Sequence, residues 1–403
     1  MIERDAAATL ARLAQGFPVL AITGPRQSGK TTLARAVFAH KPYVSLENPD
    51  ERAFALGDPK RFLARFEQGA VLDEVQRCPE LLSWLQGVVD HRRVMGDFVL
   101  TGSAQFDLVQ GITQSLAGRV GRVELLPLSA SELQGAGLLP NSLEQLLLQG
   151  GYPALYDRAL TPHDWFANYM ATYVERDVRQ LIAVRDLNQF QTFVRMCAAR
   201  TGQLLNLSAL GADCGISSVT ARQWLGVLEA SYFVTLLRPH HRNLGKRLVK
   251  TPKLYFLDVG LAAWLLGIRE AASLHTHAAR GALFETWVVG ELHKQRLHRG
   301  MAADLHFWRD NIGTEVDALV EEPDGPRPLE IKSGSTWASD WPDTLRKWQR
   351  YAQTTTPTPW VIYGGDQSHA RDGVHLWSWR DAGRWAAARH KVDDQTHGIP
   401  PGS

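Results

Sequence analysis

The stretch Gly24-Pro-Arg-Gln-Ser-Gly-Lys-Thr31 limits the possible folds of this chain more than any other. It matches the phosphate-loop pattern G-x-x-x-x-G-K-[ST] at every fixed position. An apolar run of strand length precedes it at 18–23, and an alanine-rich, helix-forming run follows it at 32–39. In this context the backbone N–H groups of the loop and the helix N-terminus can bind a phosphate. The motif therefore predicts an α/β fold with a parallel-sheet core that binds a nucleotide.

The loop also predicts individual roles, and ATP and Mg²⁺ as the cofactors. We expect Lys30 to reach the β- and γ-phosphates and the Thr31 hydroxyl to ligate Mg²⁺. A chance match is the alternative, and the strand-loop-helix context argues against it. The expected nucleotide-binding residues are Gly24, Pro25, Arg26, Gln27, Ser28, Gly29, Lys30, Thr31 and Thr32.

Composition narrows the class of protein only moderately. A chain of 403 residues can form two or three domains, and a net charge of +2 says little about partners. Three scattered cysteines, Cys78, Cys197 and Cys214, favour a reducing, cytoplasmic setting over a disulfide framework or a zinc site. The first residues lack the pattern of a signal peptide, and no apolar run approaches the ~18 residues of a membrane span. We therefore expect a cytoplasmic protein with no membrane contact.

Two carboxylates end the apolar run 70–72 and suit the hydrolysis of a nucleotide. On the strand beside the phosphate loop, Asp73 would hold the Mg²⁺ shell and Glu74 would polarise the attacking water. Any strand that leaves a core can end in acids, so this pattern gains its meaning from the loop upstream.

Further polar residues follow later strands of the predicted core. Thr101 and Ser103 end the run 98–103, where open α/β sheets bind ligands, although Gly102 can equally mark a simple turn. Arg119 could stabilise charge on the γ-phosphate, in its own subunit or a neighbour's, or it could be a solvated surface arginine.

Five motifs together resemble a widespread prokaryotic group of AAA-type ATPases. The group carries a C-terminal domain of unknown function with a restriction-endonuclease-like fold. The resemblance implies a P-loop core with a catalytic glutamate, in which Lys30, Thr31, Asp73, Glu74 and Ser103 take the roles given above. The motifs are Gly24–Thr31, Val71–Gln76, Leu100–Ser103, Ser115–Arg119 and Leu126–Ser129.

The middle of the chain has the pattern of a helix-turn-helix followed by a hairpin. Ser217 suits a helix N-cap, and apolar residues at helical spacing mark a buried stripe. The runs 232–237 and 253–257 would form the wing strands, with 240–247 at the tip. The stripe consists of Val219, Trp224, Leu225 and Leu228.

This predicted winged helix is basic, which favours contact with DNA phosphates. Lids of ATPases and protein-binding units use the same fold, so these alternatives stay open. Residues 200–253 include eight basic residues and two acids, Asp213 and Glu229, which gives a net charge of +6. The basic residues are Arg200, Arg222, Arg238, Arg242, Lys246, Arg247, Lys250 and Lys253.

Residues 315–332 read as strand, turn and strand. If Asp324-Gly325 is the centre of the hairpin, Asp317 faces Lys332 and Glu330 is a diagonal neighbour. Two carboxylates can hold Mg²⁺, and a lysine nearby can orient or activate water. One face would carry Asp317, Glu330 and Lys332, and the other Val316, Ala318, Val320, Leu329 and Ile331.

An acid on the apolar stripe of a helix, Glu285, would need a metal or an ion pair if buried. With it, the hairpin resembles the nuclease superfamily defined by an aspartate followed by Glu-x-Lys. The resemblance implies Asp317 and Glu330 as metal ligands, Lys332 as the catalytic lysine and Glu285 as the helix acid. An ordinary hairpin with a charged solvent face is the alternative.

The sequence thus predicts an ATPase that couples its nucleotide state to DNA binding or processing, with oligomerisation left open. A rival hypothesis is a non-catalytic switch or scaffold whose C-terminal domain binds a protein partner. A small-molecule P-loop kinase is a third, and it would require neither the winged helix nor the acidic hairpin. The expected parts are a P-loop core at 1–142, a helical lid or connector at 143–200, a winged helix at 201–270, a restriction-endonuclease-like α/β domain at 271–390 and a flexible tail at 391–403.

Overall fold

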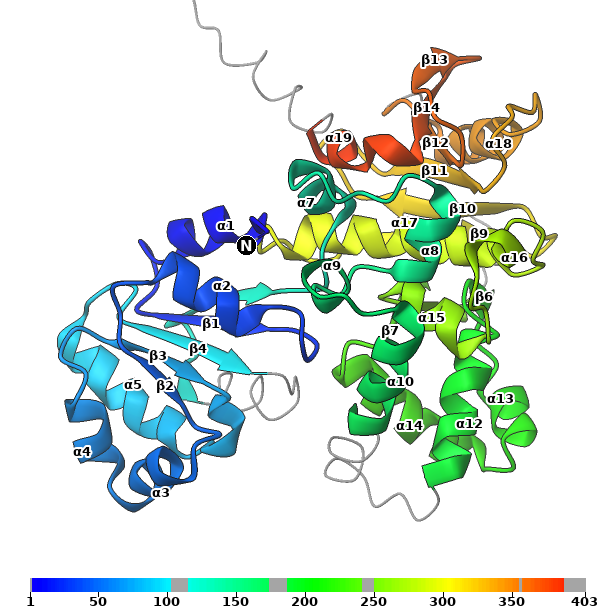
Figure 1. Cartoon of the computed structure of the whole chain (residues 1–403). Helices are drawn as coiled ribbons and strands as arrows, with labels where there is room; N and C mark the ends of the chain where they lie inside the picture. Colours follow the sequence, from blue (N-terminus) through cyan, green and yellow to red (C-terminus); the bar gives the residue numbers. More distant parts are fainter. Residues whose placement is uncertain (1, 103–114, 174–186, 241–249, 355–356, 388–403) are drawn as a thin grey trace, which may run out of the picture.

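The computed structural model describes residues 2–102, 115–173, 187–240, 250–354 and 357–387. Two lobes are visible, a smaller N-terminal one and a larger one that contains the rest of the chain (Figure 1). No helix in the described ranges has the length and apolar character needed to cross a membrane. The predicted tail, 391–403, lies outside these ranges.

The N-terminal lobe contains a five-stranded sheet of parallel strands in the order β2-β3-β4-β1-β5. β1, β3 and β4 are buried along their whole length, which is typical of a parallel sheet covered on both faces. The predicted α/β class is confirmed. The strands are β1 (Val19–Thr23), β2 (Tyr43–Ser45), β3 (Ala70–Asp73), β4 (Phe98–Gly102) and β5 (Val120–Glu124).

Helices cover both faces of this sheet. Leu10 of α1 and Leu33 of α2 pack on one face, and Phe62 of α4 and Leu85 of α5 pack on the other. The phosphate loop joins β1, which lies between β4 and β5, to α2. The helices are α1 (Ala6–Leu13), α2 (Lys30–Val37), α3 (Pro49–Gly57), α4 (Pro59–Ala64) and α5 (Leu81–Arg92), with a short 3-10 turn η1 (Val75–Arg77).

The strand order corrects one expectation. The strand that ends in Asp73 is not the neighbour of the phosphate-loop strand, because β4 pairs with both β1 and β3 and lies between them. Sequence proximity does not determine strand order in a parallel sheet, since each crossover can pass a strand.

The larger lobe contains a nine-stranded mixed sheet in the order β13-β14-β12-β11-β10-β9-β7-β8-β6. β7 and β9 pair in parallel at Arg238–His306 and Pro239–Phe307, so the sheet continues across the predicted boundary at 270. The strands are β6 (Gln203–Leu204), β7 (Val234–Pro239), β8 (Lys253–Phe256), β9 (Leu305–Arg309), β10 (Glu315–Val320), β11 (Arg327–Lys332), β12 (Trp360–Tyr363), β13 (His369–Arg371) and β14 (Val374–Ser378).

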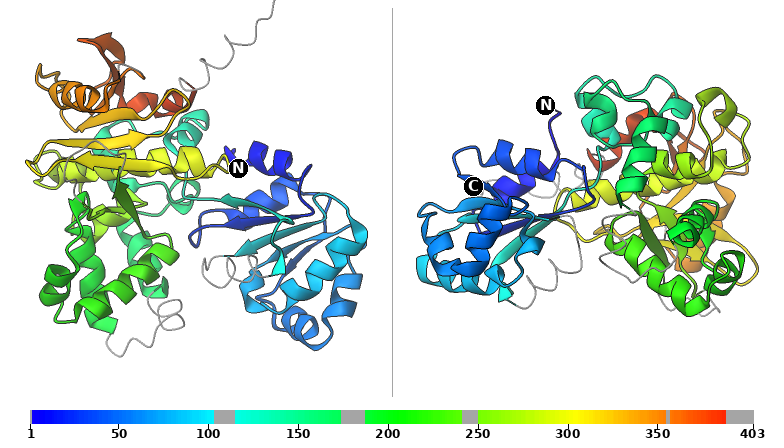
Figure 2. Two further views of the ribbon diagram at one scale, coloured as in Figure 1. Left: turned by 180° about the vertical axis from the view of Figure 1, so that it is seen from behind. Right: turned by 60° about the horizontal axis from the view of Figure 1, so that its bottom comes forward.

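The longest helix, α17 (Arg280–Leu297), crosses the larger lobe, and its C-terminal end points toward the N-terminal lobe near α1 (Figures 1 and 2). It packs against α15, β8 and β11. The other helices are α7 (Ala130–Gly135), α8 (Leu143–Gln149), α9 (Ala154–Asp157), α10 (Pro162–Tyr173), α12 (Leu187–Ala198), α13 (Leu207–Asp213), α14 (Ser218–Ala230), α15 (Val259–Leu265), α16 (Ala271–Leu274), α18 (Asp343–Ala352) and α19 (Ala382–Ala387), with the 3-10 turn η3 (Trp379–Asp381).

The expected helix pair with a tight turn is present as α13 and α14. The Ser217 hydroxyl accepts the Thr220 N–H at 3.0 Å, which is the predicted N-cap. Trp224, Leu225 and Leu228 are buried, but Val219 is 65% exposed, so its predicted place in the stripe is wrong. Val219 lies in the first turn of α14, on the side that faces solvent.

Candidate functional site

Positive backbone angles shape the phosphate loop between β1 and α2. Gly24 has φ 146° and Gly29 has φ 95°, and Gln27 also adopts a left-handed conformation at φ 61°. A Cβ on Gly24 would lie 2.2 Å from the carbonyl oxygen of Leu125, so only glycine fits there. The loop is therefore pressed against the segment that follows β5.

Two polar groups of the loop are placed to meet an anion. The Lys30 ammonium is buried and donates to the carbonyls of Gly24 at 3.0 Å and Pro25 at 2.7 Å. The Ser28 hydroxyl is fully buried and has no hydrogen-bond partner among the described residues. Because buried hydroxyls are almost always hydrogen-bonded, a phosphate oxygen is a fitting partner.

Asp73, at the end of β3, contacts side chains of β2 and β4 and of the first turn of α2. It accepts hydrogen bonds from Thr31 at 3.0 and 3.2 Å and from the Tyr43 hydroxyl at 2.8 Å, and it contacts Thr101 at the end of β4. Burial and the hydrogen bond to Asp73 raise the pKa of Tyr43 to about 12. Thr31 and Asp73 thus form a hydroxyl–carboxylate pair of the kind that holds a hydrated Mg²⁺ ion.

Glu74 follows Asp73 directly and has a left-handed backbone, with φ 58°. That conformation is uncommon for a residue with a side chain and turns Glu74 away from the direction of β3. Its carboxylate accepts a hydrogen bond from the Gln76 amide. Ser103, another expected catalytic residue, lies outside the described residues, as does most of the segment between β4 and β5.

The expected action of Arg119 within its own subunit is wrong. Arg119 precedes β5, and its carbonyl accepts the Val19 N–H at the start of β1. The phosphate loop follows the opposite end of β1, roughly 16 Å away for a strand of this length. Arg119 instead pairs with Asp90 of α5, with N–O distances of 2.5 and 2.8 Å, on the surface. Action on a neighbouring subunit stays a prediction.

The hairpin of β10 and β11 has a different register from the predicted one. Ala318 pairs with Leu329 and Val320 with Arg327, so the connection spans 321–326 and is not centred on Asp324-Gly325. Extending this register sets Asp317 opposite Glu330, and the expected pairing of Asp317 with Lys332 is wrong.

A β-bulge further changes the faces of β10. Asp317 and Ala318 together stand opposite Phe307 alone, between the pairs Val316–Trp308 and Leu319–His306. Val316 consequently packs with Leu319 and not with Ala318 and Val320, contrary to the predicted alternation. The bulge sets the direction of the Asp317 side chain.

Asp317, Glu330 and Lys332 do lie close together. The Lys332 ammonium is 2.6 Å from Glu330 Oε1, and Asp317 Oδ2 accepts the Ile331 N–H at 2.8 Å. The second oxygen of Glu330 is buried without a hydrogen-bond partner among the described residues. Burial raises the pKa of both acids, and the repulsion between Asp317 and Glu330 raises that of Asp317 further. A divalent cation would relieve these costs.

Glu285 has protein partners that the sequence did not indicate. Lys253 of β8 is 3% exposed, and its ammonium lies 3.0 Å from Glu285 and also contacts Glu315. The Tyr255 hydroxyl contacts Glu285 as well. Lys253 therefore lies among Glu285, Glu315, Asp317 and Glu330, which together form an acidic cluster, and not on the predicted basic surface. In the sequence, only the position of Lys253 in the apolar run 253–257 indicates that its side chain is buried.

The described residues offer one group of three metal-ligand side chains with ligand atoms within 4.8 Å, and it lies elsewhere, at Asp5, Glu132 and His298. Glu132 already accepts from Arg4 and from the Asp5 N–H, and His298 Nε2 accepts the Leu126 N–H. The Glu132 carboxylate and His298 Nε2 therefore already accept from protein donors, and His298 Nδ1 lies 3.5 Å from Glu132 Oε1. Glu285 as a metal ligand stays a prediction.

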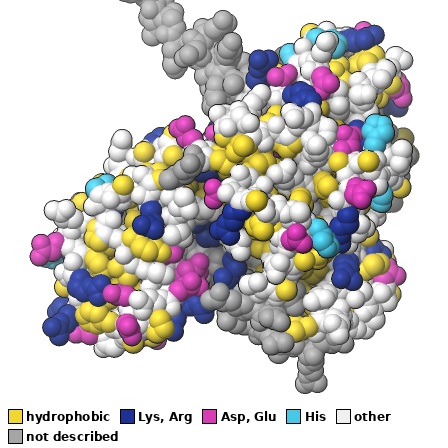
Figure 3. Space-filling view, in the orientation of Figure 1, with side chains coloured by type: hydrophobic (Ala, Val, Ile, Leu, Met, Phe, Trp, Pro, Cys, Tyr) yellow, Lys and Arg dark blue, Asp and Glu magenta, His cyan; other side chains and the backbone are white. Residues whose placement is uncertain are grey.

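The basic surface of the helix-turn-helix is smaller than predicted. Arg200 pairs with Asp213, and Lys253 is buried. Arg222, Arg238 and Lys250 are exposed. Arg242, Lys246 and Arg247 lie outside the described residues. On the face in Figure 3, basic side chains near the boundary of the lobes have acidic side chains beside them, so this face is not of a single sign.

The raised pKa of Asp317 gives a stability prediction. The pKa of Asp317 is higher in the folded protein than in the unfolded chain, where an aspartate has a pKa of about 3.9. Its ionisation therefore destabilises the fold, and this cost develops as the pH rises from the unfolded pKa through the folded pKa. In EDTA at neutral pH, Asp317→Asn should therefore raise the thermal midpoint by roughly a few degrees. Glu315→Gln, which weakens the contacts to Lys253 and Arg309, should lower it. A fall of equal size in both variants would contradict this account.

Comparison with known proteins gives three consecutive family matches. Residues 16–134 match an AAA domain, residues 140–272 match a domain of unknown function (DUF8612), and residues 280–381 match a domain of unknown function (DUF4143). The solved structure of the Walker-type ATPase PABY2304 of Pyrococcus abyssi has 15% identity and a TM-score of 0.45, over 66% of this chain and 96% of that one.

Two mycobacterial proteins are similar over most of the chain. They are the uncharacterized proteins Rv2008c of Mycobacterium tuberculosis and Mb2031c of Mycobacterium bovis, both 35% identical over 338 residues, which is 83% of this chain and 74% of theirs. The resemblance to AAA-type ATPases with a C-terminal domain of unknown function is confirmed. The chain belongs to the family of these mycobacterial proteins, with an N-terminal AAA-type P-loop ATPase domain followed by the domains DUF8612 and DUF4143.

Proposed function

We propose that this protein hydrolyses ATP with Mg²⁺ and uses its nucleotide state to control an action of its larger lobe on DNA. The observation that carries the ATPase part is the contact of Thr31 with Asp73 beside a phosphate loop whose buried Ser28 hydroxyl has no hydrogen-bond partner in the described part of the chain. Bound Mg²⁺ would neutralise phosphate charge and orient the β- and γ-phosphates.

The chain's own residues have separate roles in this reaction. Lys30 exchanges its two carbonyl partners for phosphate oxygens, and the loop N–H groups hold the phosphates in line. Glu74 orients a water molecule and accepts its proton as the oxygen bonds to the γ-phosphorus and the bond to the leaving ADP oxygen breaks. Arg119 would act only on the nucleotide of an adjacent subunit.

For the larger lobe we propose a winged helix at 201–270 and a restriction-endonuclease-like domain at 271–390. The winged helix is supported by helices α13 and α14 with the three strands β6, β8 and β7 beside them, and α12 of the preceding segment packs against α13. The nuclease-like domain is supported by α17 on a mixed sheet and by the cluster of Asp317, Glu330 and Lys332. There a divalent ion would be held by Asp317 and Glu330, with Lys332 directing the attacking water.

One observation favours a second candidate function, a nucleotide-dependent switch that does not cut. The buried ammonium of Lys253 already neutralises Glu285 and Glu315. With Glu285 paired in this way, two acids rather than three stay available for metal. The larger lobe would then bind a partner, and its fold would persist without its chemistry.

The role of Glu74 is tested by Glu74→Gln, which keeps the size of the side chain but cannot accept a proton. We expect nucleotide affinity close to wild type and a loss of turnover of about 10²-fold or more, measured by phosphate release and by titration with a fluorescent nucleotide. Glu80→Gln, an exposed acid six residues on, is the control. Turnover at the wild-type rate in Glu74→Gln would refute the assignment.

DNA contact is tested with Arg222→Ala/Arg238→Ala, which removes two exposed bases of the helix-turn-helix module. Each lost phosphate contact should weaken binding and reduce the slope of log K against log salt by about 1, measured by fluorescence anisotropy on a duplex. Lys60→Ala in α4 is the matched control on the ATPase lobe. An unchanged, salt-sensitive affinity in the double variant would exclude this surface.

Cutting is tested on supercoiled plasmid with Mg²⁺ or Mn²⁺. Wild-type protein should nick or linearise the plasmid, and Asp317→Ala and Lys332→Ala should each lose this activity, because one removes a metal ligand and the other the lysine beside Glu330. Equal cutting by all three would indicate contamination and favour the switch.

A further inference from the structure

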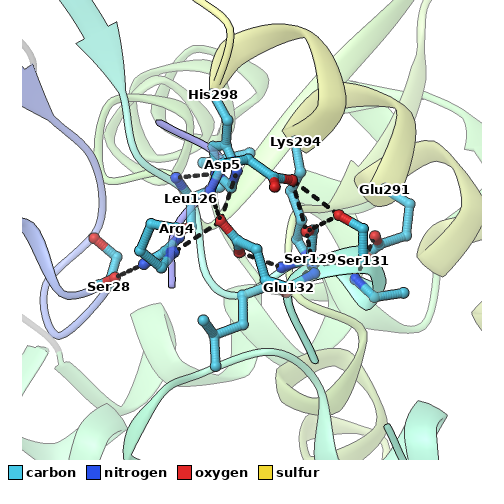
Figure 4. A network of polar contacts seen from close by, with 12 residues as sticks. Arg4, Asp5, Ser28, Leu126, Ser129, Ser131, Glu132, Glu291, Lys294 and His298 are labelled. Atoms are coloured by element: carbon cyan, nitrogen blue, oxygen red, sulfur yellow. Dashed lines mark hydrogen bonds and ion pairs between the residues drawn. The ribbon is translucent and has the colours of Figure 1, made fainter. Parts of the chain in front are cut away.

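A single arginine near the N-terminus contacts the phosphate loop from outside. Arg4 is 8% exposed and precedes α1. Its guanidinium donates to the carbonyl oxygens of Ser28 and Leu126, both at 2.7 Å, and to the Glu132 carboxylate at 2.9 Å (Figure 4). All of its contacts are thus with groups at or beside the nucleotide site.

We propose that Arg4 is a positioning residue for nucleotide binding. It orients the Gly29 N–H toward the phosphates, and this orientation depends on the position of α17. This inference rests on the proposed nucleotide binding. A trans peptide is planar, so the carbonyl of Ser28 and the N–H of Gly29 point in opposite directions. Arg4 holds the Ser28 oxygen on the outer side of the loop. The Gly29 N–H is thereby turned inward, at the start of α2, where it can meet a phosphate oxygen.

The space around Gly29 agrees with a close fit. A Cβ on Gly29 would lie 3.3 Å from Arg4 Nη1, and apart from Gly29 and its two chain neighbours no other heavy atom of the described residues comes as near to it. Gly29 has a left-handed backbone, which allows the chain to reverse between Ser28 and Lys30. The guanidinium therefore packs directly on the peptide that it orients.

Glu132 fixes the direction of the guanidinium. Its carboxylate accepts the N–H groups of Asp5 and Ser129, both at 2.8 Å, and it closes a capping box at the start of α7. Burial alone would raise the pKa of Glu132, but Arg4 and His298 hold it well below its usual range. An ionised, fully bonded carboxylate leaves Arg4 no freedom to turn away from Ser28.

The segment 126–130 is bonded at three points to α17 and to the residue that follows it (Figure 4). His298, just past the helix, accepts the Leu126 N–H at 3.1 Å. Within the helix, Lys294 donates to the Leu128 carbonyl at 2.9 Å, and Glu291 accepts the Ala130 N–H at 2.8 Å. A shift of α17 would move residues 126–132 and with them the partners of Arg4.

Through α17, the nucleotide site is also coupled to the acidic cluster, because this helix carries Glu285 near its N-terminal end. Coupling between two sites is reciprocal in binding free energy. Whatever binds at the acidic cluster and shifts α17 would therefore change the affinity for nucleotide.

The experiment compares Arg4→Gln with Arg92→Gln. Arg92 also donates to a carbonyl, that of Phe66 at 2.8 Å, and pairs with an acid, Asp97 at 3.4 Å, but it is bonded to the start of β4, away from the phosphate loop. We expect Arg4→Gln to raise the Kd for Mg²⁺-ATP about tenfold or more, equal to about 1.4 kcal/mol, and Arg92→Gln to leave it unchanged. The thermal midpoint of each variant is measured beside its Kd.

Arg4→Lys covers the case in which Arg4→Gln does not fold. Lysine keeps a positive charge near Glu132, but one ammonium cannot span Ser28, Leu126 and Glu132 together. We expect a midpoint close to wild type with a weakened nucleotide affinity. Wild-type affinity in folded Arg4→Lys or Arg4→Gln would overturn the inference, as would an equal loss in Arg92→Gln. Absence of binding in the wild-type protein would instead overturn the proposed function.

Discussion

The structure depends on how the buried charged side chains of α17 are paired. Five of the six residues from 291 to 296 in α17 are polar and each is less than a tenth exposed: Glu291, His293, Lys294, Gln295 and Arg296. Burying such groups costs several kcal/mol unless each finds a partner. Glu291 and Lys294 pair with each other and with backbone groups of Ala130 and Leu128, in the segment that follows β5. These bonds hold α17 against the segment that follows β5. Moving the helix past this segment would break the bonds to Leu128 and Ala130, although the ion pair of Lys294 with Glu291 would stay intact.

A second join comes from the helix-turn-helix module. Its strand β7 pairs with β9. The Tyr232 hydroxyl, just before β7, donates to Thr23 at 3.0 Å, directly before the phosphate loop. From the neighbouring strand β8, Lys253 enters the acidic cluster. One hairpin thus contacts the end of the ATPase β1 and the carboxylates of the larger lobe. Both proposed chemistries lie within reach of the same short element.

Short sequence patterns predicted the features that depend on neighbouring residues. They did not predict the features that depend on packing between distant segments. The phosphate loop, the Thr31–Asp73 contact and the Ser217 cap follow from short motifs, and the structure contains each. The position of β4 between β1 and β3, the bulge at Asp317 and the six-residue connection of the hairpin depend on packing against other strands. Lys253 and Arg119 look like surface bases in the sequence, yet only the fold decides that one is buried beside Glu285 and the other lies far from the loop.

We propose that α17 responds to nucleotide at the phosphate loop through its contacts with residues 126–132. Amide hydrogen exchange with and without Mg²⁺-ATP tests it directly, because exchange reports local opening at each segment. The account predicts slower exchange in the phosphate loop and also in 126–132 and in the C-terminal half of α17. Slowing confined to the five-stranded sheet and its loops, with α17 unchanged, would contradict it.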